Sequence, residues 1–193
     1  MHHDTSLPPL PADACFDTAQ RRALDGAMRF LALVQTWGQP AAMTQALTQV
    51  GQCLMQATAL DIAEAYFARA LQWSATLGAV DAQVDLLCTL AELHTRLARQ
   101  AYADDRDESI GNACRERARD HAFDAAALAG QVTDPQWEVR VLLRISDVLD
   151  NCGDHAEAVT LQDRAVALLG LHDTGLAPDL NELPALTAPA QLM

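Results

Sequence analysis

The sequence contains no lysine, because all 13 of its basic residues are arginine. Lysine is indispensable to Schiff-base enzymes, pyridoxal-phosphate enzymes, Walker A ATPases and protein kinases, so these four classes are excluded. The arginines are outnumbered by 26 acidic residues, which gives a formal net charge of -13. This negative charge disfavours attraction to nucleic acid and to anionic lipid, so neither is an expected partner.

Long apolar runs and export signals are also missing. Runs such as Leu31 to Val34 are far shorter than the roughly 20 residues that a membrane-spanning helix needs. The chain opens on Met1, His2 and His3, whereas a secretory signal begins with basic residues followed by an apolar stretch. We therefore expect a soluble, cytoplasmic protein that has no membrane partner.

Catalytic and metal-binding spacings are absent as well. The five cysteines, at positions 15, 53, 88, 114 and 152, never form the close pairs of a zinc or redox motif, so we expect buried thiols. Glu92 and His94 are too close for a Glu-x-x-His pair, and His94 is expected to pack in the core. The acidic run from Asp104 to Glu108 lacks the spacing of a calcium loop and is typical of a helix-hairpin tip, with Asp105 or Asp107 as a cap. No cofactor, metal or enzymatic activity is predicted.

Apolar residues recur at helical spacing along most of the 193 residues, which predicts an all-α fold. We expect one domain at 14–170, between a flexible N-terminal tail at 1–13 and a Pro/Leu-rich C-terminal tail at 171–193. Gly38, Gly78 and Gly153 are predicted to end helices, while Asp61 and Asp134 are predicted to cap them. The predicted helices span 14–37, 41–56, 62–77, 80–103, 109–130, 135–152 and 154–170.

Two of the predicted helix pairs share one pattern of small and large residues. Small residues at the repeated positions let helices cross closely, and large residues fill the space between crossings. The repeat aligns Leu47, Val50, Gly51, Leu54, Ala63, Phe67 and Ala70 with Leu142, Ile145, Ser146, Leu149, Ala158, Gln162 and Ala165.

This pattern resembles the tetratricopeptide repeat (TPR) family, whose motif runs from an aromatic residue or Leu through Leu-Gly, Tyr, Ala, Phe and Ala to Pro. Residues 44–78 and 139–172 carry the resemblance, with Ala75 in place of the closing proline. The middle pair is similar but holds about fifteen extra residues. The resemblance implies a right-handed, TPR-like α-solenoid of about seven antiparallel helices, with a projecting central hairpin.

TPR-like solenoids bind extended peptides or partner helices on a concave wall formed by the first helix of each hairpin. The resemblance therefore implies a non-catalytic interaction module for a protein or peptide partner, and the negative charge favours a basic one. A full clamp for a C-terminal carboxylate is not expected, since only Arg140 and Arg144 match that arrangement. Helical phase gives the candidate wall residues as Gln45, Gln49, Gln52, Gln56, Asp85, Thr89, Glu92, Arg96, Arg140, Arg144, Asp147 and Asn151.

Several alternatives remain open from the sequence. The glutamine row is either a solvated face or a set of contacts to a ligand backbone. Either tail, or a second copy in a homodimer, is an alternative occupant of the groove. A regulatory sensor of a small peptide or ligand is the second functional hypothesis, and an all-α metal enzyme is the third.

Overall fold

The structure, a computed structural model, describes residues 16–103 and 108–173. These residues form helices without any strand, which confirms the all-α prediction. The two predicted tails lie largely outside the described residues. The helices are α1 (Thr18–Trp37), α2 (Pro40–Gln56), α3 (Leu60–Leu77), α4 (Val80–Ala103), α5 (Glu108–Ala129), α6 (Pro135–Cys152) and α7 (His155–Asp173).

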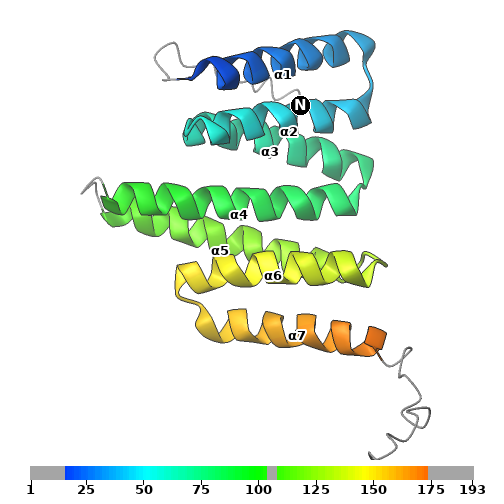
Figure 1. Cartoon of the computed structure of the whole chain (residues 1–193), viewed down its shortest axis with the longest axis vertical. Coiled ribbons are helices and arrows are strands. Elements are labelled where there is room, and N and C mark those ends of the chain that lie inside the picture. Colours follow the sequence, from blue (N-terminus) through cyan, green and yellow to red (C-terminus); the bar gives the residue numbers. More distant parts are fainter. Residues whose placement is uncertain (1–15, 104–107, 174–193) are drawn as a thin grey trace, which may run out of the picture.

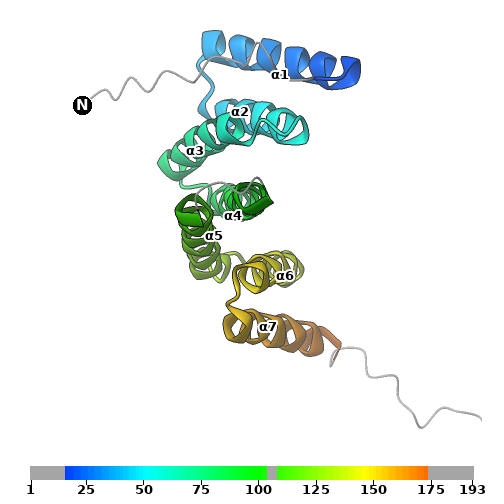
Figure 2. The same cartoon turned by 90° about the vertical axis from the view of Figure 1, so that its left-hand side faces the viewer.

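The helices follow one another in a single row. Each helix packs on the next helix of the chain, and α4 also contacts α6. Figure 1 shows the row from α1 to α7, with the axes of the helices running across it. In Figure 2, turned by 90°, α2, α4 and α6 lie on one side of the row while α3 and α5 lie on the other. The row thus presents α2, α4 and α6 together on one face.

Local sequence accounts for several helix ends. Gly38, Gly78 and Gly153 adopt positive φ values of 65°, 65° and 92° after α1, α3 and α6, a conformation that costs glycine little. The Asp134 side chain accepts hydrogen bonds from the first turn of α6. These four predicted ends are confirmed.

Two predicted helix starts are wrong. Helix α1 begins at Thr18, not at Ala14, because Asp17 has extended backbone and caps the helix. Its carboxylate accepts from the Gln20 N–H at 2.7 Å, and the Gln20 side chain accepts from the Asp17 N–H at 3.0 Å. Helix α3 begins at Leu60 after Ala59, which makes no side-chain cap bond, so Asp61 lies inside the first turn.

The core consists of apolar clusters arranged along the row. One large cluster joins α1, α2, α3 and one face of α4, and the other joins the opposite face of α4 to α5, α6 and α7. Helix α4 gives Leu86, Leu90 and Leu93 to the first cluster and a second stripe, which includes Leu87 and Ala91, to the other. Helix α4 is therefore fixed on two sides, and its third side forms part of the face shared with α2 and α6.

Helical spacing predicts Leu77 and Ile110 on the buried stripes of their helices, but both side chains are exposed. Leu77 and Ile110 have exposed fractions of 43% and 51%. Leu77 borders an open groove. On α5 the buried residue is Gly111, which follows Ile110 and lies against the ring of Tyr102. In α1, helical spacing predicts an inner stripe of Phe16, Ala23, Ala27, Phe30 and Val34. Of these, Ala27 and Val34 are buried together with Leu24 and Leu31, Phe16 and Phe30 are partly buried, and Ala23 is exposed.

The cysteine prediction holds only in part. Cys88 and Cys152 are buried, whereas Cys53 and Cys114 are only half-buried. Cys15 and the predicted caps Asp105 and Asp107 lie outside the described residues.

The sequence repeat corresponds to equivalent contacts within two hairpins. A Cβ atom on Gly51 of α2 would lie 2.8 Å from Cε1 of Phe67 on α3. Ser146 of α6 accepts a hydrogen bond from the Gln162 side chain on α7 at 3.5 Å. Both pairs are separated by 16 residues, so a small side chain faces the same position of the return helix in each hairpin.

The central hairpin is longer than its neighbours. Helices α4 and α5 have 24 and 22 residues, compared with 17 and 18 in α2 and α3. Figure 1 shows one end of α4 and α5 extending beyond the other helices. Tyr102 holds this end together, because its hydroxyl bonds to Asn112 at 2.7 Å and the Arg115 guanidinium lies 5.2 Å from its ring centroid.

Candidate functional site

An open groove with a volume of about 740 Å³ lies between α2 and α4. Its surface combines side-chain amides and hydroxyls with small aliphatic groups and two carboxylates. The groove is lined by Ala41, Thr44, Gln45, Thr48, Gln49, Gln52, Leu77, Ala79, Asp81, Ala82, Asp85, Leu86, Thr89 and Arg144.

Three smaller hollows lie beside this groove on the same face. One of about 260 Å³ lies between α1 and α2 and shares Gln49 and Gln52 with the groove. Two others, of about 220 and 240 Å³, lie between α4 and α6 and share Arg144 with it. The groove and these hollows together contain all twelve candidate wall residues, so the structure gathers the set on one face.

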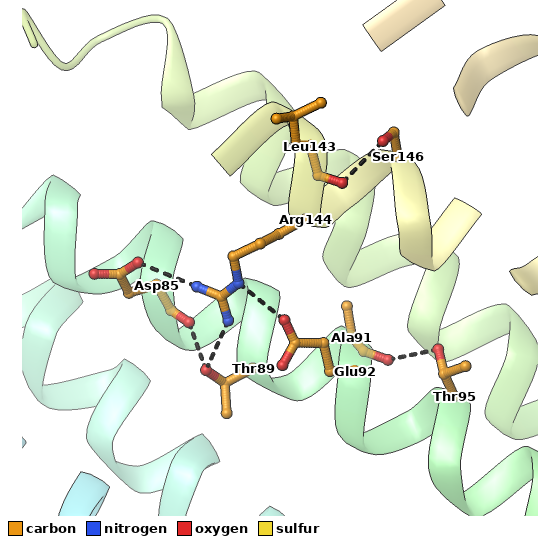
Figure 3. A network of polar contacts seen from close by, with 8 residues as sticks. All are labelled: Asp85, Thr89, Ala91, Glu92, Thr95, Leu143, Arg144 and Ser146. Atoms are coloured by element: carbon orange, nitrogen blue, oxygen red, sulfur yellow. Dashed lines mark hydrogen bonds and ion pairs between the residues drawn. The ribbon is translucent and has the colours of Figure 1, made fainter. Parts of the chain in front are cut away.

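Arg144 of α6 crosses to α4 and joins three polar side chains there (Figure 3). Its Nε donates to Oε1 of Glu92 at 2.9 Å, and its Nη1 lies 3.4 Å from Oδ1 of Asp85. Its Nη2 is 3.5 Å from the Thr89 hydroxyl, which in turn donates to the Asp85 carbonyl at 2.8 Å. One arginine therefore fixes α6 against three residues of the α4 wall.

The charge of Arg144 is compensated within the protein. Burial alone would lower the pKa of Arg144, but the hydrogen bond to Glu92 and the nearby carboxylates raise it above its ordinary value. The guanidinium is thus a permanent cation already paired with Glu92 and Asp85. It is therefore not a free cation for a partner's carboxylate.

The remaining charged wall residues differ in their partners. Arg96 and Arg140 form no ion pair with any other described residue. Asn151 is engaged by two contacts, because its amide oxygen accepts from Arg99 and its nitrogen donates to the Asp147 carbonyl at 2.6 Å. Arg96 and Arg140 therefore keep charges that face solvent.

The glutamine row lies along the exposed side of α2. Gln45, Gln52 and Gln56 are exposed, while Gln49 is half-buried between the groove and the hollow under α1. Gln56 adds a backbone contact, since its carbonyl accepts from the Gln20 side chain of α1 at 3.3 Å. The side-chain amides of all four glutamines form no hydrogen bond with another described residue, so their donors and acceptors can face a ligand.

Several residues of this face were not predicted from the sequence. Asp81 lies one turn before Asp85 and Arg99 lies one turn after Arg96, so the helical phase of α4 contained the signal for both. Thr44 and Thr48 lie beside the glutamines of α2 in the same way. Extending the predicted α4 stripe by one turn at each end would have found Asp81 and Arg99, whereas Thr44 and Thr48 required a wider stripe on α2.

A second polar cluster lies outside the groove, where α3, α4 and α5 meet. His94 has a side chain only 1% exposed, stacks on His121 with ring centroids 5.4 Å apart, and places Nε2 3.5 Å from Oε1 of Glu64. Its Nδ1 has no hydrogen-bond partner among the described residues. Burial, with smaller effects of His121 and Arg117, lowers the pKa of His94 to about 4, so the imidazole is neutral near pH 7. His94 is a buried packing residue, as predicted.

Metal-ligating side chains are dispersed over the described part of the chain. Within 16–103 and 108–173, no three His, Cys, Asp or Glu side chains are grouped so that they could hold a metal ion. The helices of these segments include none that is both long and apolar enough to cross a bilayer.

No family model matches the chain, and no curated protein matches it by sequence. The solved structures that are similar to the chain include the following two. The first, described as "DHF58 filament", is 20% identical over 81% of this chain and 83% of its own, with a TM-score of 0.48. The second, BtubC (BKLC) from P. vanneervenii, is 15% identical over 91% of this chain and 100% of its own, with a TM-score of 0.32. At these TM-scores neither similarity supports a conclusion about this chain.

Proposed function

We propose that this protein is a non-catalytic, TPR-like helical-repeat module that binds an extended peptide segment of a partner protein along α2, α4 and α6. The observation that carries the proposal is the groove of about 740 Å³ together with the hollows beside it. These cavities lie on the wall where the TPR resemblance implies peptide binding, and they contain every candidate wall residue.

The chemistry of the groove suits a polypeptide. Side-chain amides such as Gln45 and Gln52 offer both a donor and an acceptor, which match the N–H and C=O groups of an extended backbone. Between them, aliphatic surface from residues such as Ala82 and the exposed Leu77 can accept apolar side chains of the partner. Affinity would then come from apolar burial, and orientation from the polar wall.

Peptide selection with a groove-filling variant tests this proposal. Random twelve-residue peptides are displayed on phage and selected on the immobilised protein, and the selected peptides are synthesised and titrated by fluorescence anisotropy. In the variant Gln45→Trp an exposed groove residue becomes an indole that occupies part of the cavity. The matched control is Gln72→Trp on α3, which is also exposed and lies outside the described cavities.

We expect Gln45→Trp to weaken peptide binding at least tenfold, while Gln72→Trp leaves it unchanged. Equal affinity for the parent protein and Gln45→Trp would place the peptides elsewhere on the molecule. A selection that yields no binding peptide would equally contradict the proposal.

A further inference from the structure

The charges along α4 are ordered, and the ordering restricts which peptide fits. Helical spacing puts the charged residues Asp81, Asp85, Glu92, Arg96 and Arg99 on one stripe of this helix. The two aspartates line the groove beside α2, and the two arginines line the hollow beside α6. The stripe therefore begins with carboxylates and ends with guanidinium groups.

Arg144 neutralises the middle of this stripe. It pairs with Glu92 and contacts Asp85, and it is the one side chain shared by the groove and the hollow beside Glu92. Asp81 and Arg96 form no ion pair with any other described residue. On the α4 stripe, the charges without an ion pair to a described residue are thus Asp81 at one end and Arg96 and Arg99 at the other. From α6, Arg140 borders the hollow that contains Asp85, and Asp147 borders the hollow that contains Arg96 and Arg99.

The distance between these two charges follows from helix geometry. Asp81 and Arg96 are separated by 15 positions on one helix, which corresponds to about 22 Å at 1.5 Å per residue. An extended chain covers about 3.3 Å per residue, so this distance is spanned by about seven residues of a peptide.

Building on the function proposed above, we infer that the occupant is an extended segment that carries one basic and one acidic residue about seven positions apart. Its basic side chain lies at Asp81 and Asp85, and its acidic side chain lies at Arg96 and Arg99. Charge complementarity at both ends fixes the register of the segment along the groove. A segment with only basic residues gains the contact at one end and is repelled at the other.

Synthetic peptides of eleven residues test this inference. Each contains one Arg and one Glu in a background of Ala, Leu and Gln, the separation runs from three to nine positions, and both orders of the two charges are made. Affinity is measured by fluorescence anisotropy at about 50 mM salt, where exposed charges are only partly screened. Carboxylates at the start of α4 and guanidinium groups at its end would also stabilise α4 itself through the helix dipole. The dependence of peptide affinity on the separation of its two charges distinguishes a peptide-binding role from this structural one.

We expect affinity to peak at a separation of about seven in one of the two orders, at least fivefold above a separation of three. In the variant Arg96→Glu, the peptide residue that lies at position 96 should be preferred as Arg instead of Glu. Asp81→Asn should weaken the best peptide, and Arg29→Gln on the exposed surface of α1 should not change it. An affinity independent of separation, or an Arg96→Glu variant that keeps the parent preference, would overturn the inference.

The same data separate the two proposals. Peptides that bind without regard to separation, but weaken with Gln45→Trp, contradict the charge ordering and leave the groove as the peptide site. If no peptide of the series binds, and the phage selection also fails, then both proposals are wrong. If selected peptides bind in the groove but the designed series does not, the charge ordering alone is wrong.

Discussion

Gly51 of α2 faces the ring of Phe67 on α3 so closely that a Cβ atom at Gly51 would lie 2.8 Å from the ring. Phe67 is fully buried, so its ring has no room to withdraw. Gly51 therefore sets the distance between the two helices of the first repeat-like hairpin. Small residues at a crossing have this effect in other packed helices as well.

We predict that Gly51→Ala destabilises the protein by about 1 kcal/mol. Replacing glycine by alanine in a helix ordinarily stabilises by up to about 1 kcal/mol, but here overpacking costs about 1–3 kcal/mol. At Gly26 of α1 an added Cβ atom would meet nothing within 4 Å, so Gly26→Ala serves as the control and should stabilise. Urea unfolding monitored by circular dichroism measures both changes.

Replacing Phe67 tests whether contact with its ring causes the penalty of Gly51→Ala. In a Phe67→Leu background, where the ring edge is absent, Gly51→Ala should lose most of its penalty. If Gly51→Ala remains as costly there, contact with Phe67 does not explain the requirement for glycine.

A second prediction concerns the ion pair of Arg144 and Glu92, in which Nε of Arg144 lies 2.9 Å from Oε1 of Glu92. Both side chains are about one third exposed, so water and salt weaken the attraction, and we expect a coupling energy of about 0.5–1 kcal/mol. A double-mutant cycle with Arg144→Gln and Glu92→Gln measures it. The coupling should shrink when the salt concentration is raised to about 1 M.

Arg140 provides the comparison for this cycle. It lies one turn from Arg144 on α6 but pairs with no described residue, so Arg140→Gln should change stability by less than about 0.5 kcal/mol. A zero coupling between Arg144 and Glu92 would show that the contact does not hold α6 against α4.

The Arg144 network illustrates what the sequence could and could not predict about the site. Helical phase correctly put Asp85, Thr89 and Glu92 on one face of α4, because this property depends on neighbours within a single helix. The pairing of Glu92 with Arg144 joins residues 52 positions apart, and only the packing of α6 on α4 brings them together. The grouping of these residues on one face of α4 was therefore predictable from the sequence, whereas the compensation of their charge by Arg144 was not.

The fold shows the same division. Gly38 and Gly153 gave correct helix ends because a local conformation suits glycine there. The burial of α4 on two faces was not predicted, although its Leu86, Leu90 and Leu93 form a second apolar stripe. A helix with apolar residues on two faces requires neighbouring helices on both sides. The leucine stripe of α4 was therefore the sequence signal for its burial on two faces.

A third prediction follows from the buried His94. Its folded-state pKa is lowered to about 4 by burial, compared with about 6.5 in an unfolded chain. Between these values the unfolded chain binds more protons than the folded protein, so stability rises with pH and falls as the pH drops. Between about pH 7.5 and pH 5 we expect a loss of about 2 kcal/mol from this group.

Other titratable and charged groups face His94, so a control variant must separate its protonation from theirs. His121 stacks on it with a pKa that burial also lowers, and Glu64 and Arg117 lie alongside. In His94→Phe an aromatic ring is kept and the titration is removed, so the loss of stability over the same pH range should become smaller. If His94→Phe and the parent lose the same stability, the protonation of His94 does not control the acid response.

The last prediction concerns the thiol of Cys88 on α4. Burial raises the pKa of Cys88 to about 12, with a smaller lowering effect of Arg144 and smaller raising effects of Glu92 and Asp85, so its thiolate is scarce at about pH 8. The residue is only 2% exposed, whereas Cys53 and Cys114 are half-buried. Iodoacetamide should therefore modify Cys53 or Cys114 before Cys88, and Cys88 should react at the rate of global unfolding. Mass spectrometry of a labelling time course measures the order. Modification of Cys88 as early as Cys53 would mean that the junction between α4 and the second apolar cluster opens without global unfolding.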